Sequence, residues 1–199
     1  VFESILWRII PKYVEENNNF ILVGGCALNV LFNQKLKAYL NTLNKNLYVP
    51  SNPNDCGLAL GQYLLDNPDS KPSVYSGFDI LDRDEKLDRI NRDIKTSQVV
   101  DMLKQGKILG MVEGNSEVGP RALGNRSIIC DPSFENMKDI LNSKVKFREW
   151  FRPFAPVCRL EDKDKYFDLA YESEYMSYAP FLKEEFHDKL KSICHADGT

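Results

Sequence analysis

The sequence predicts an α/β protein in which short apolar strands alternate with helices. Compact apolar runs at residues 20–23, 47–49 and 108–112 are bounded by turn residues, which is typical of short buried strands. Helical spacing resumes after most of these turns. Between the two sets of elements, residues 66–95 hold two prolines, many charges and little apolar periodicity. The pattern therefore predicts two α/β pieces joined by a linker.

The elements of the first piece follow in order. Residues 5–14 read as a short helix, and the strand at 20–23 ends at the tight turn Gly24–Gly25, after which a helix begins over 27–32. The strand at 47–49 leads into a loop of turn formers at 50–54, and a helix covers 58–65. A helical stretch is expected inside the linker, near residues 84–94.

The second piece begins near Thr96. A helix at 99–105 is closed by Gly106, a strand covers 108–112, and a glycine-rich loop at 114–125 leads to a strand at 127–130. Asp131–Pro132 is typical of a helix start and predicts a helix to about residue 141. Residues 154–160 are expected to form a further strand.

Composition excludes several classes of protein. The 199 residues carry 26 basic and 29 acidic side chains, a net charge of −3, with 43% hydrophobic and 28% charged residues, which is ordinary for a globular protein. No apolar run approaches the roughly 18 residues of a membrane span, and no secretory signal is visible. The five cysteines contain no CxxC pair, so a disulfide framework is not expected and a reducing, cytoplasmic location is. The first residue is not Met, which suggests a fragment.

Two glycine-rich loops are candidate ligand sites. Gly24–Gly25 lies between a strand and a helix, where backbone N–H groups can approach an anion, and Asp55 lies in a loop where it could bind a metal or a ribose. Taken alone, these are more often structural turns. The run from Glu117 to Ser127 carries Arg121 and Arg126 among two glycines and a proline but matches neither a Walker loop nor a dinucleotide-binding fingerprint. Solvated arginines on a structural turn are the alternative.

A basic, aromatic stretch follows at residues 144–156. Residues 119–159 hold eight basic and four acidic side chains, a net charge of +4, so the rest of the chain carries −7. Arginine's planar fork suits phosphate or carboxylate groups. A short basic stretch with acidic flanks favours a small anionic substrate over a polynucleotide. A solvated helix face is the alternative.

Together these runs resemble the NodU/CmcH/TobZ-type carbamoyltransferase family, whose members transfer a carbamoyl group to a hydroxyl of a sugar, antibiotic or related acceptor. The matching runs are residues 22–29, 54–61, 119–128, 142–156 and 195–199, in the family's order and spacing. The resemblance covers nearly the whole chain.

The resemblance implies pieces of two domains, incomplete at both termini. Residues 1–65 are similar to the end of an actin/sugar-kinase-like (ASKHA) domain, residues 66–95 to a linker, and residues 96–199 to a YrdC-like α/β domain. In the family, carbamoyl phosphate and ATP give carbamoyl-adenylate with loss of pyrophosphate, and the first domain transfers the carbamoyl group. The implied cofactors are ATP, with Mg, and iron or another divalent metal in the first domain.

The resemblance also assigns roles to residues. Those expected to neutralise carbamoyl phosphate and the ATP phosphates are Arg121, Lys146, Arg148 and Arg152. Gly24, Gly25, Asn29, Gly119 and Arg126 are expected to contact the cofactor, Asp55 to bind metal, and His195 to be catalytic. Glu117 is expected to orient an arginine. The implied partners are carbamoyl phosphate, ATP and a small hydroxylated acceptor, without nucleic acid or membrane; a homodimer is one option.

The sequence also departs from the family. The metal-binding histidine pair belongs to a region without counterpart here, and Asn115 stands where the family often has arginine. The polypeptide alone is therefore expected not to be a competent transferase. The alternative is a module that binds nucleotide or anion without turnover; a small RNA-binding domain is disfavoured by the acidic remainder.

Overall fold

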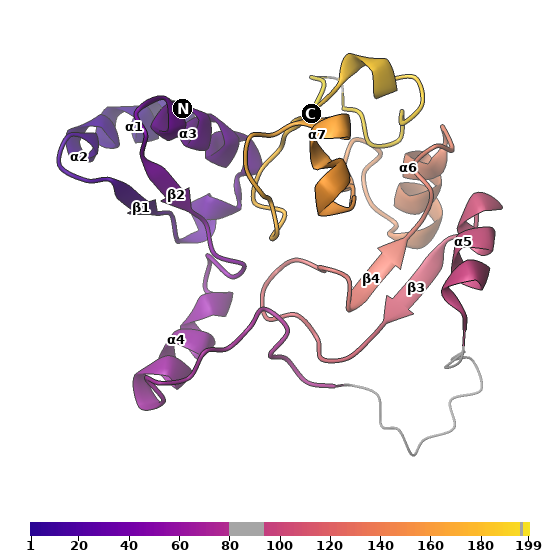
Figure 1. Ribbon diagram of the computed structural model, residues 1–199, viewed down its shortest axis with the longest axis horizontal. Coiled ribbons are helices and arrows are strands. Elements are labelled where there is room, and N and C mark those ends of the chain that lie inside the picture. The colour runs from indigo at the N-terminus through magenta and orange to yellow at the C-terminus, as the bar shows by residue number, and fades with distance from the viewer. Residues whose placement is uncertain (80–93, 196) are drawn as a thin grey trace. The chain divides into compact units, whose positions relative to one another are not determined.

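The structure is a computed structural model that describes residues 1–79, 94–195 and 197–199 (Figure 1). The chain divides into two compact units. Unit 1 comprises Val1–Val74, Val118–Arg121 and Ser173–Ala179, and unit 2 comprises Tyr75–Glu117, Ala122–Glu172 and Pro180–Thr199. Two short segments from late in the sequence therefore fold with the beginning of the chain.

Unit 1 pairs two short parallel strands, and helix α3 packs on β2. Strand β1 pairs with β2 so that Phe20 lies opposite Leu47. The break between α1 and α2 falls at Pro11, which has no N–H to continue a helix. The elements are α1 (Phe2–Ile9), α2 (Pro11–Val14), β1 (Asn19–Ile21), the 3₁₀ turn η1 (Gly25–Leu28), α3 (Val30–Thr42), β2 (Asn46–Tyr48) and α4 (Cys56–Asp66).

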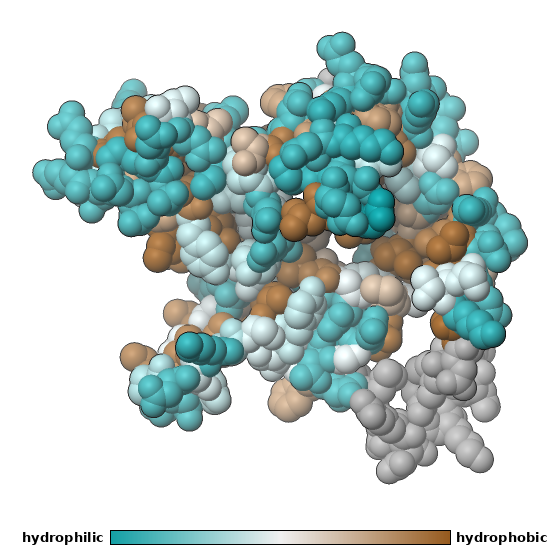
Figure 2. Space-filling view, viewed as in Figure 1, coloured by the Kyte–Doolittle hydropathy of each residue, from teal (hydrophilic) through white to brown (hydrophobic). Residues whose placement is uncertain are grey.

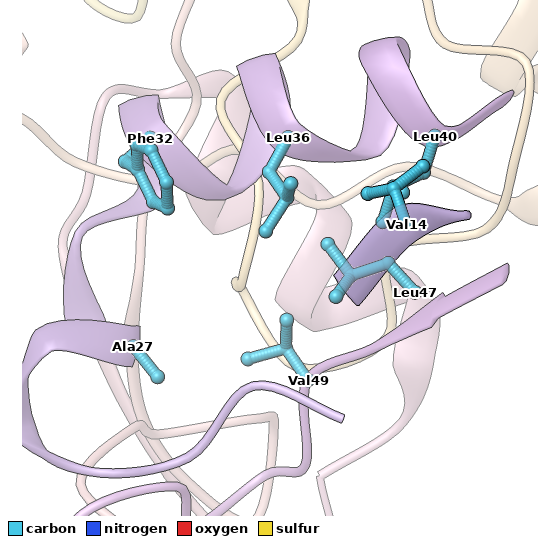
Figure 3. Close-up of a cluster of buried hydrophobic side chains, with 7 residues drawn as sticks. All are labelled: Val14, Ala27, Phe32, Leu36, Leu40, Leu47 and Val49. Atoms are coloured by element: carbon cyan, nitrogen blue, oxygen red, sulfur yellow. The ribbon is translucent and has the colours of Figure 1, made fainter. Parts of the chain in front are cut away.

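The core of unit 1 is built on one face of α3. Phe32, Leu36 and Leu40 recur every four residues, so their side chains line up along the helix and are fully buried. Figure 3 shows them facing Leu47, on β2, and Val49, which directly follows β2. The ring of Trp7 packs edge-on against Phe32, with 5.6 Å between centroids, which fixes α1 on this core.

The late segment Ser173–Ala179 is tied into unit 1 by a buried amide. Asn33 on α3 is fully buried, and its Nδ2 donates to the backbone oxygens of Ala27 (2.8 Å) and Ser177 (2.9 Å). Tyr178 packs against the core beside it. A single helix residue thus fastens a segment that is 144 positions away in sequence.

Unit 2 holds two small antiparallel sheets and several short helices. Its sheets pair β3 with β4 and β5 with β6. The elements are α5 (Thr96–Lys104), β3 (Leu109–Val112), β4 (Arg126–Ile129), α6 (Met137–Ile140), the π-helical turn η2 (Leu141–Val145), η3 (Leu160–Asp162), α7 (Lys163–Tyr166), β5 (Phe167–Asp168), β6 (Phe181–Leu182) and η4 (Glu184–Phe186).

Most predicted elements are present, with two corrections. The helix expected from residue 132 begins at Met137, because the Asp131 carboxylate accepts from the Ser133 N–H (2.9 Å) and forms a turn instead. The strand expected at 154–160 is absent from the described structure: Pro156 has no N–H to donate to a ladder, and no described strand lies beside it. The helix expected near 84–94 falls almost entirely outside the described residues.

Hydrophobic residues also reach the surface, where they appear brown in Figure 2. On α4, Leu58 is 72% exposed and Leu65 is 77% exposed. None of the described helices combines the length and the apolar character needed to cross a membrane. All five cysteines are free thiols.

Candidate functional site

The Gly24–Gly25 turn is open on the surface of unit 1. Gly24 has a φ of +93°, a conformation that glycine adopts readily, and a Cβ at either glycine would meet no atom within 4 Å. The Gly24 N–H donates to the Pro53 carbonyl (2.7 Å). The predicted cofactor residue Asn29 caps α3, because its Oδ1 accepts from the Phe32 N–H (3.0 Å). A ligand could thus approach the backbone of the two glycines. The Asn29 side chain stabilises the first turn of α3, which follows them.

Asp55, the predicted metal ligand, precedes the first residue of α4 and is exposed. Its side chain makes no capping hydrogen bond. Within residues 1–79, 94–195 and 197–199, no group of three or more His, Cys, Asp or Glu residues could hold a metal ion. The described residues therefore do not fit a metal centre at Asp55 by themselves.

The glycine-rich loop after β3 is organised by Glu117. Its Oε1 accepts from the backbone N–H groups of Leu123 (2.7 Å), Asn125 (2.8 Å) and Arg126 (3.3 Å). Partial burial by itself raises the pKa of Glu117, but these N–H groups outweigh it and lower the pKa below its usual value. Glu117 was expected to orient an arginine side chain; its carboxylate instead gathers the backbone that leads into β4.

The guanidinium of Arg126 is bonded within the same loop. Its Nη1 donates to the carbonyls of Glu113 and Asn125, and its Nη2 to those of Phe78 and Gly114. Its Nε is buried and has no hydrogen-bond partner among the described residues. Four of five N–H donors are thus used by the loop itself, so Arg126 has little left to offer an anion in this conformation.

Gly119 and Arg121 lie at the tip of this loop, within unit 1. Gly119 has a φ of +141°, and a Cβ there would lie 2.7 Å from the Ser51 carbonyl oxygen, so the loop reaches this position only with glycine. The Nη2 of Arg121 lies 3.5 Å from the Leu28 oxygen.

Arg121 also lines a shallow pocket with room for one water-sized group. The same pocket is bounded by Tyr175, whose pKa is raised to about 12, chiefly by a hydrogen bond with Glu174. The other lining residues are Ala27, Leu28, Val30, Pro50, Ser51, Pro53, Met176 and Ser177. Arg121 is therefore brought to the residues that follow the Gly24–Gly25 turn.

The basic stretch forms a loop anchored by Asn142. This residue lies in the π-helical turn η2 and is 1% exposed. Its Nδ2 donates to the carbonyls of Trp150 (3.2 Å) and Arg152 (3.0 Å), and its Oδ1 accepts from the Nε of Arg148 (2.7 Å). The loop 146–152 is thus closed around one buried amide, which we call the Asn142 loop.

The predicted phosphate-binding side chains of the Asn142 loop keep donors to offer. Arg148 uses Nε for Asn142 and Nη2 for the Pro153 carbonyl (3.1 Å), and stacks at 4.4 Å over the Phe154 ring. The Arg152 guanidinium lies 3.6 Å from the Glu149 carboxylate, and Lys146 is exposed. Burial, followed by the charge of Arg152, lowers the pKa of Arg148, which indicates like charges held close together.

Aromatic side chains accompany these cations on the surface. Phe147 is 82% exposed and has a φ of +49°, a left-handed conformation that is costly for a residue with a side chain. Trp150 and Phe151 are also exposed and pack edge to face, with 5.9 Å between centroids. Exposed rings beside cations make a surface suited to a ligand that is both flat and anionic.

His195 begins a tight turn at the end of the sequence. Its backbone N–H donates to the Thr199 oxygen (2.9 Å), and its Nδ1 lies 3.2 Å from the Thr199 Oγ1. Burial lowers the pKa of His195, with Asp197 acting against this and Lys138 reinforcing it. Burial therefore favours the neutral form of the ring.

The structure divides the predicted residues between the units. Gly24, Gly25, Asn29, Asp55, Gly119 and Arg121 belong to unit 1, and Arg126, Lys146, Arg148, Arg152 and His195 belong to unit 2. Sequence reasoning did not single out Asn142 or Asn33, whose buried amides hold the loop and the late segment. An asparagine among apolar helical residues was the available signal, because a buried amide needs partners.

Known proteins are similar to this chain in sequence. The family described as carbamoyltransferase C-terminus matches residues 100–199. Nodulation protein U of Rhizobium fredii is 32% identical over 200 residues, covering 97% of this chain and 34% of that protein. The 3'-hydroxymethylcephem-O-carbamoyltransferase of Amycolatopsis lactamdurans is 33% identical over 208 residues, covering 100% of this chain and 39% of that protein.

A further relative is nodulation protein NolO of Bradyrhizobium diazoefficiens, which is 35% identical over 199 residues, covering 89% of this chain and 36% of that protein. The chain spans only about a third of the length of these relatives. The family match nevertheless includes the loop base at Glu117, the Asn142 loop and the His195 turn. The chain belongs to the carbamoyltransferase family.

Proposed function

We propose that this chain is part of an O-carbamoyltransferase that forms carbamoyl-adenylate from carbamoyl phosphate and ATP and passes the carbamoyl group to a hydroxyl. The observation that carries the proposal is the Asn142 loop, which holds two guanidinium groups and a lysine together on a surface with exposed aromatic rings. The family membership supplies the reaction class.

Atom balance defines the first half-reaction. Joining the carbamate oxygen to the α-phosphorus of ATP breaks the bond to pyrophosphate, and carbamoyl phosphate gives up its phosphate with uptake of one water. Pyrophosphate and phosphate are therefore released together with each carbamoyl-adenylate. In the second half-reaction the acceptor hydroxyl oxygen forms a bond to the carbamoyl carbon, AMP leaves, and the hydroxyl proton is released.

The Asn142 loop would contribute electrostatic stabilisation. Displacement at phosphorus develops charge on oxygens that are already anionic, and positioned cations lower its barrier. Arg148 has three N–H donors not used by the described residues, and Arg152 forms an exposed ion pair with Glu149 at 3.6 Å. Arg126 is a weaker contributor, because four of its donors are occupied.

Unit 1 would take part in carbamoyl transfer. We infer that residues 1–65 are the end of an ASKHA domain and residues 96–199 a YrdC-like domain. The open glycine turn after β1, a strand that pairs in parallel with β2, supports the first assignment. Gly24 and Gly25 would approach the nucleotide, with Arg121 near them. The family's divalent metal does not fit the described residues around Asp55, so no step is assigned to it.

The acceptor is proposed from the names of the relatives. A cephem hydroxymethyl group is carbamoylated by one of them, and others are nodulation proteins. A small hydroxylated acceptor, such as a sugar, an antibiotic or a nodulation-factor-like molecule, fits this range. The free thiols support a reducing location such as the cytoplasm, and ATP would be used with Mg.

Calorimetry combined with pyrophosphate detection tests the proposal on the full 199-residue chain. We expect ATP and carbamoyl phosphate to bind, and Arg152→Ala to weaken ATP binding at least about tenfold, since a charge-assisted phosphate contact contributes about 1.5–3 kcal/mol. Arg159→Ala is the matched control, because Arg159 is exposed and already paired with Glu161 and Asp162. Loss of binding in both variants, or in neither, would contradict the proposal.

The second candidate is a module that binds nucleotide or anion without turnover. It would rest on the same side chain of the Asn142 loop, because the unused N–H donors of Arg148 can bind an anion whether or not a reaction follows. Binding without pyrophosphate release would support it. We expect no robust transfer of carbamoyl to a hydroxyl by the isolated chain, and observing such transfer would overturn that expectation.

A further inference from the structure

Residues 152–159 of unit 2 form an extended segment that pairs with no strand in the described part of the chain. They contain no helix, turn or bend, and Arg159 at the end has extended backbone angles (φ −66°, ψ 145°). Apart from the half-buried Phe154, the residues of this segment are exposed, and Val157 is 90% exposed. The backbone thus has the form of the strand that the sequence predicts at 154–160, but it lacks a neighbouring strand.

The two edges of this segment are not equivalent. In an extended chain, the N–H and C=O groups of alternate residues point to opposite edges. One edge carries the N–H groups of Ala155, Val157 and Arg159, and none of them donates to a described residue. The other edge is interrupted at Pro156, which has no N–H. Only the first edge can therefore form a ladder, which Pro153 limits at one end and the turn η3 at the other.

The charges on the two sides of the segment are opposite in sign. Residues 144–152 hold four basic and one acidic side chain, a net charge of +3, and residues 161–168 hold two basic and four acidic side chains, a net charge of −2. Antiparallel pairing of two copies would bring the basic end of each copy to the acidic end of the other. Parallel pairing would bring like charges together, which is unfavourable.

We propose that a second copy of this chain pairs with this edge in an antiparallel, two-fold symmetric ladder centred on Val157. Val157 then lies opposite the same residue of the second copy, and Ala155 lies opposite Arg159. The Arg159 oxygen accepts from the Asp162 N–H (3.0 Å) and has a second lone pair for the ladder. Both copies use the same surface, so the interface closes at a dimer. Pro156, on the opposite edge, hinders the addition of further strands.

The ladder is short, so this dimer is weak. Stable interfaces bury roughly 1,200–2,000 Å² in total, and a strand pair of a few residues buries less. Exposed strand edges nevertheless attract other strands, and a valine at the centre favours pairing. The dimer should therefore dissociate on dilution. It should also weaken at high salt, because salt screens the attraction between the opposite charges at its ends.

Amide hydrogen exchange of the full chain, measured by NMR at increasing protein concentration with a reducing agent present, tests the proposal. We expect the amides of Ala155, Val157 and Arg159 to exchange more slowly as the concentration rises, because only these N–H groups enter the ladder. The amides of Phe154 and Cys158 lie on the other edge and should not change. Equal protection of both sets, or protection of neither, would overturn the proposal.

Two proline substitutions on neighbouring residues test the edge by sedimentation. Val157→Pro removes an N–H from the centre of the ladder, and we expect it to abolish the dimer. Cys158→Pro removes an N–H from the opposite edge and should leave the dimer intact. Unchanged exchange in β3 and β4 shows that a variant is folded.

The other outcomes contradict the proposal. A dimer that persists in Val157→Pro, or that is lost equally in both variants, would show that this edge does not form the interface. A parent chain that stays monomeric at every concentration would exclude a second copy and leave the edge to a different polypeptide, such as the additional length that the relatives possess.

Discussion

Two loops of this protein carry arginines, and they are anchored in opposite ways. The glycine-rich loop is gathered by a carboxylate, since Glu117 accepts from three backbone N–H groups. The Asn142 loop is closed by a neutral amide, which donates to two carbonyls and accepts from Arg148. The first anchor is charged and only partly buried, whereas the second is uncharged and fully buried.

The difference decides what each arginine can do. In the glycine-rich loop the Glu117 carboxylate accepts from the backbone N–H groups, and Arg126 donates to four backbone carbonyls. Few hydrogen-bond donors of this loop are therefore left for a ligand. In the Asn142 loop the neutral anchor takes one N–H of Arg148, and the positive charge of Arg152 meets an exposed carboxylate, that of Glu149 at 3.6 Å. The second loop is therefore the better candidate for binding phosphate.

The largest effect is expected from Asn142→Leu. The leucine fills a similar volume but leaves two carbonyls and one guanidinium N–H without partners, and each buried unpaired group costs about 1–3 kcal/mol. We expect the loop to open locally by about 3–5 kcal/mol, seen as faster hydrogen exchange of the Arg148 amide, which is bonded to the Asn142 carbonyl (2.9 Å). ATP binding should weaken with it.

A matched change elsewhere shows whether this effect is local. Asn136 precedes α6 and makes no capping bond through its side chain, so Asn136→Ala should leave the exchange of the Arg148 amide unchanged. Exchange that is equally slow in Asn142→Leu would refute the anchoring role of the buried amide.

Glu117→Gln should have a smaller effect. The amide oxygen can still accept hydrogen bonds, but charge-assisted bonds are about twice as strong as neutral ones, so we expect a loss of about 1–2 kcal/mol. The amides of Leu123 and Asn125 should exchange faster, and that of Arg148 should not change. Glu113→Gln is the control, because Glu113 receives Arg126 through its backbone oxygen and not through its carboxylate. Equal losses in both variants would argue against the carboxylate as the anchor.

The fold was largely predictable from local patterns. The apolar runs and glycine turns placed β1, β2, β3 and β4 within one or two residues, because a short apolar run bounded by turn residues leaves a strong local signal. These strands were expected to be buried, but most of their residues are exposed or half-buried. The late segment that joins unit 1 was not foreseen, since a contact over 144 positions leaves no local trace. The start of α6 was misplaced because Asp131 satisfies a turn as well as it would cap a helix.

The sequence predicted which basic residues belong to the candidate site, but it did not predict which of them are free to bind a ligand. In the sequence, Arg126 and Arg148 look alike. In the structure, Arg126 donates to backbone carbonyls of its own loop, whereas Arg148 keeps N–H donors that no described residue uses. Sequence carries the charge of a side chain but not the number of its N–H groups that the fold consumes. The anchoring role of Asn142 was not predicted either, because the sequence does not show which hydrogen bonds its side-chain amide makes.

Arg148→Lys tests whether the hydrogen bonds of the Arg148 guanidinium stabilise the Asn142 loop. Arg152→Lys is the matched control. Lysine cannot bond the Asn142 oxygen and the Pro153 carbonyl with Arg148's planar geometry, so we expect a loss of about 1 kcal/mol in loop stability. Arg152→Lys should change stability by less than about 0.5 kcal/mol, because its pair with Glu149 is exposed. Equal costs, measured by exchange of the Arg148 amide, would remove the distinction between the two arginines.

The smallest effect concerns pH and applies to one loop only. Because folding lowers the pKa of Glu117 below its ordinary value of 4.5, its contribution to stability is fully present above that value and is lost as the pH falls through the folded-state pKa. The amide shifts of Leu123 and Asn125 should follow this titration and become flat in Glu117→Gln. The side-chain amide signals of Asn142 should stay constant over the same range, since that anchor has no proton to gain. A titration of the Asn142 signals matching that of Leu123 would mean that the two loops respond as one, and the contrast between a charged and a neutral anchor would lose its basis.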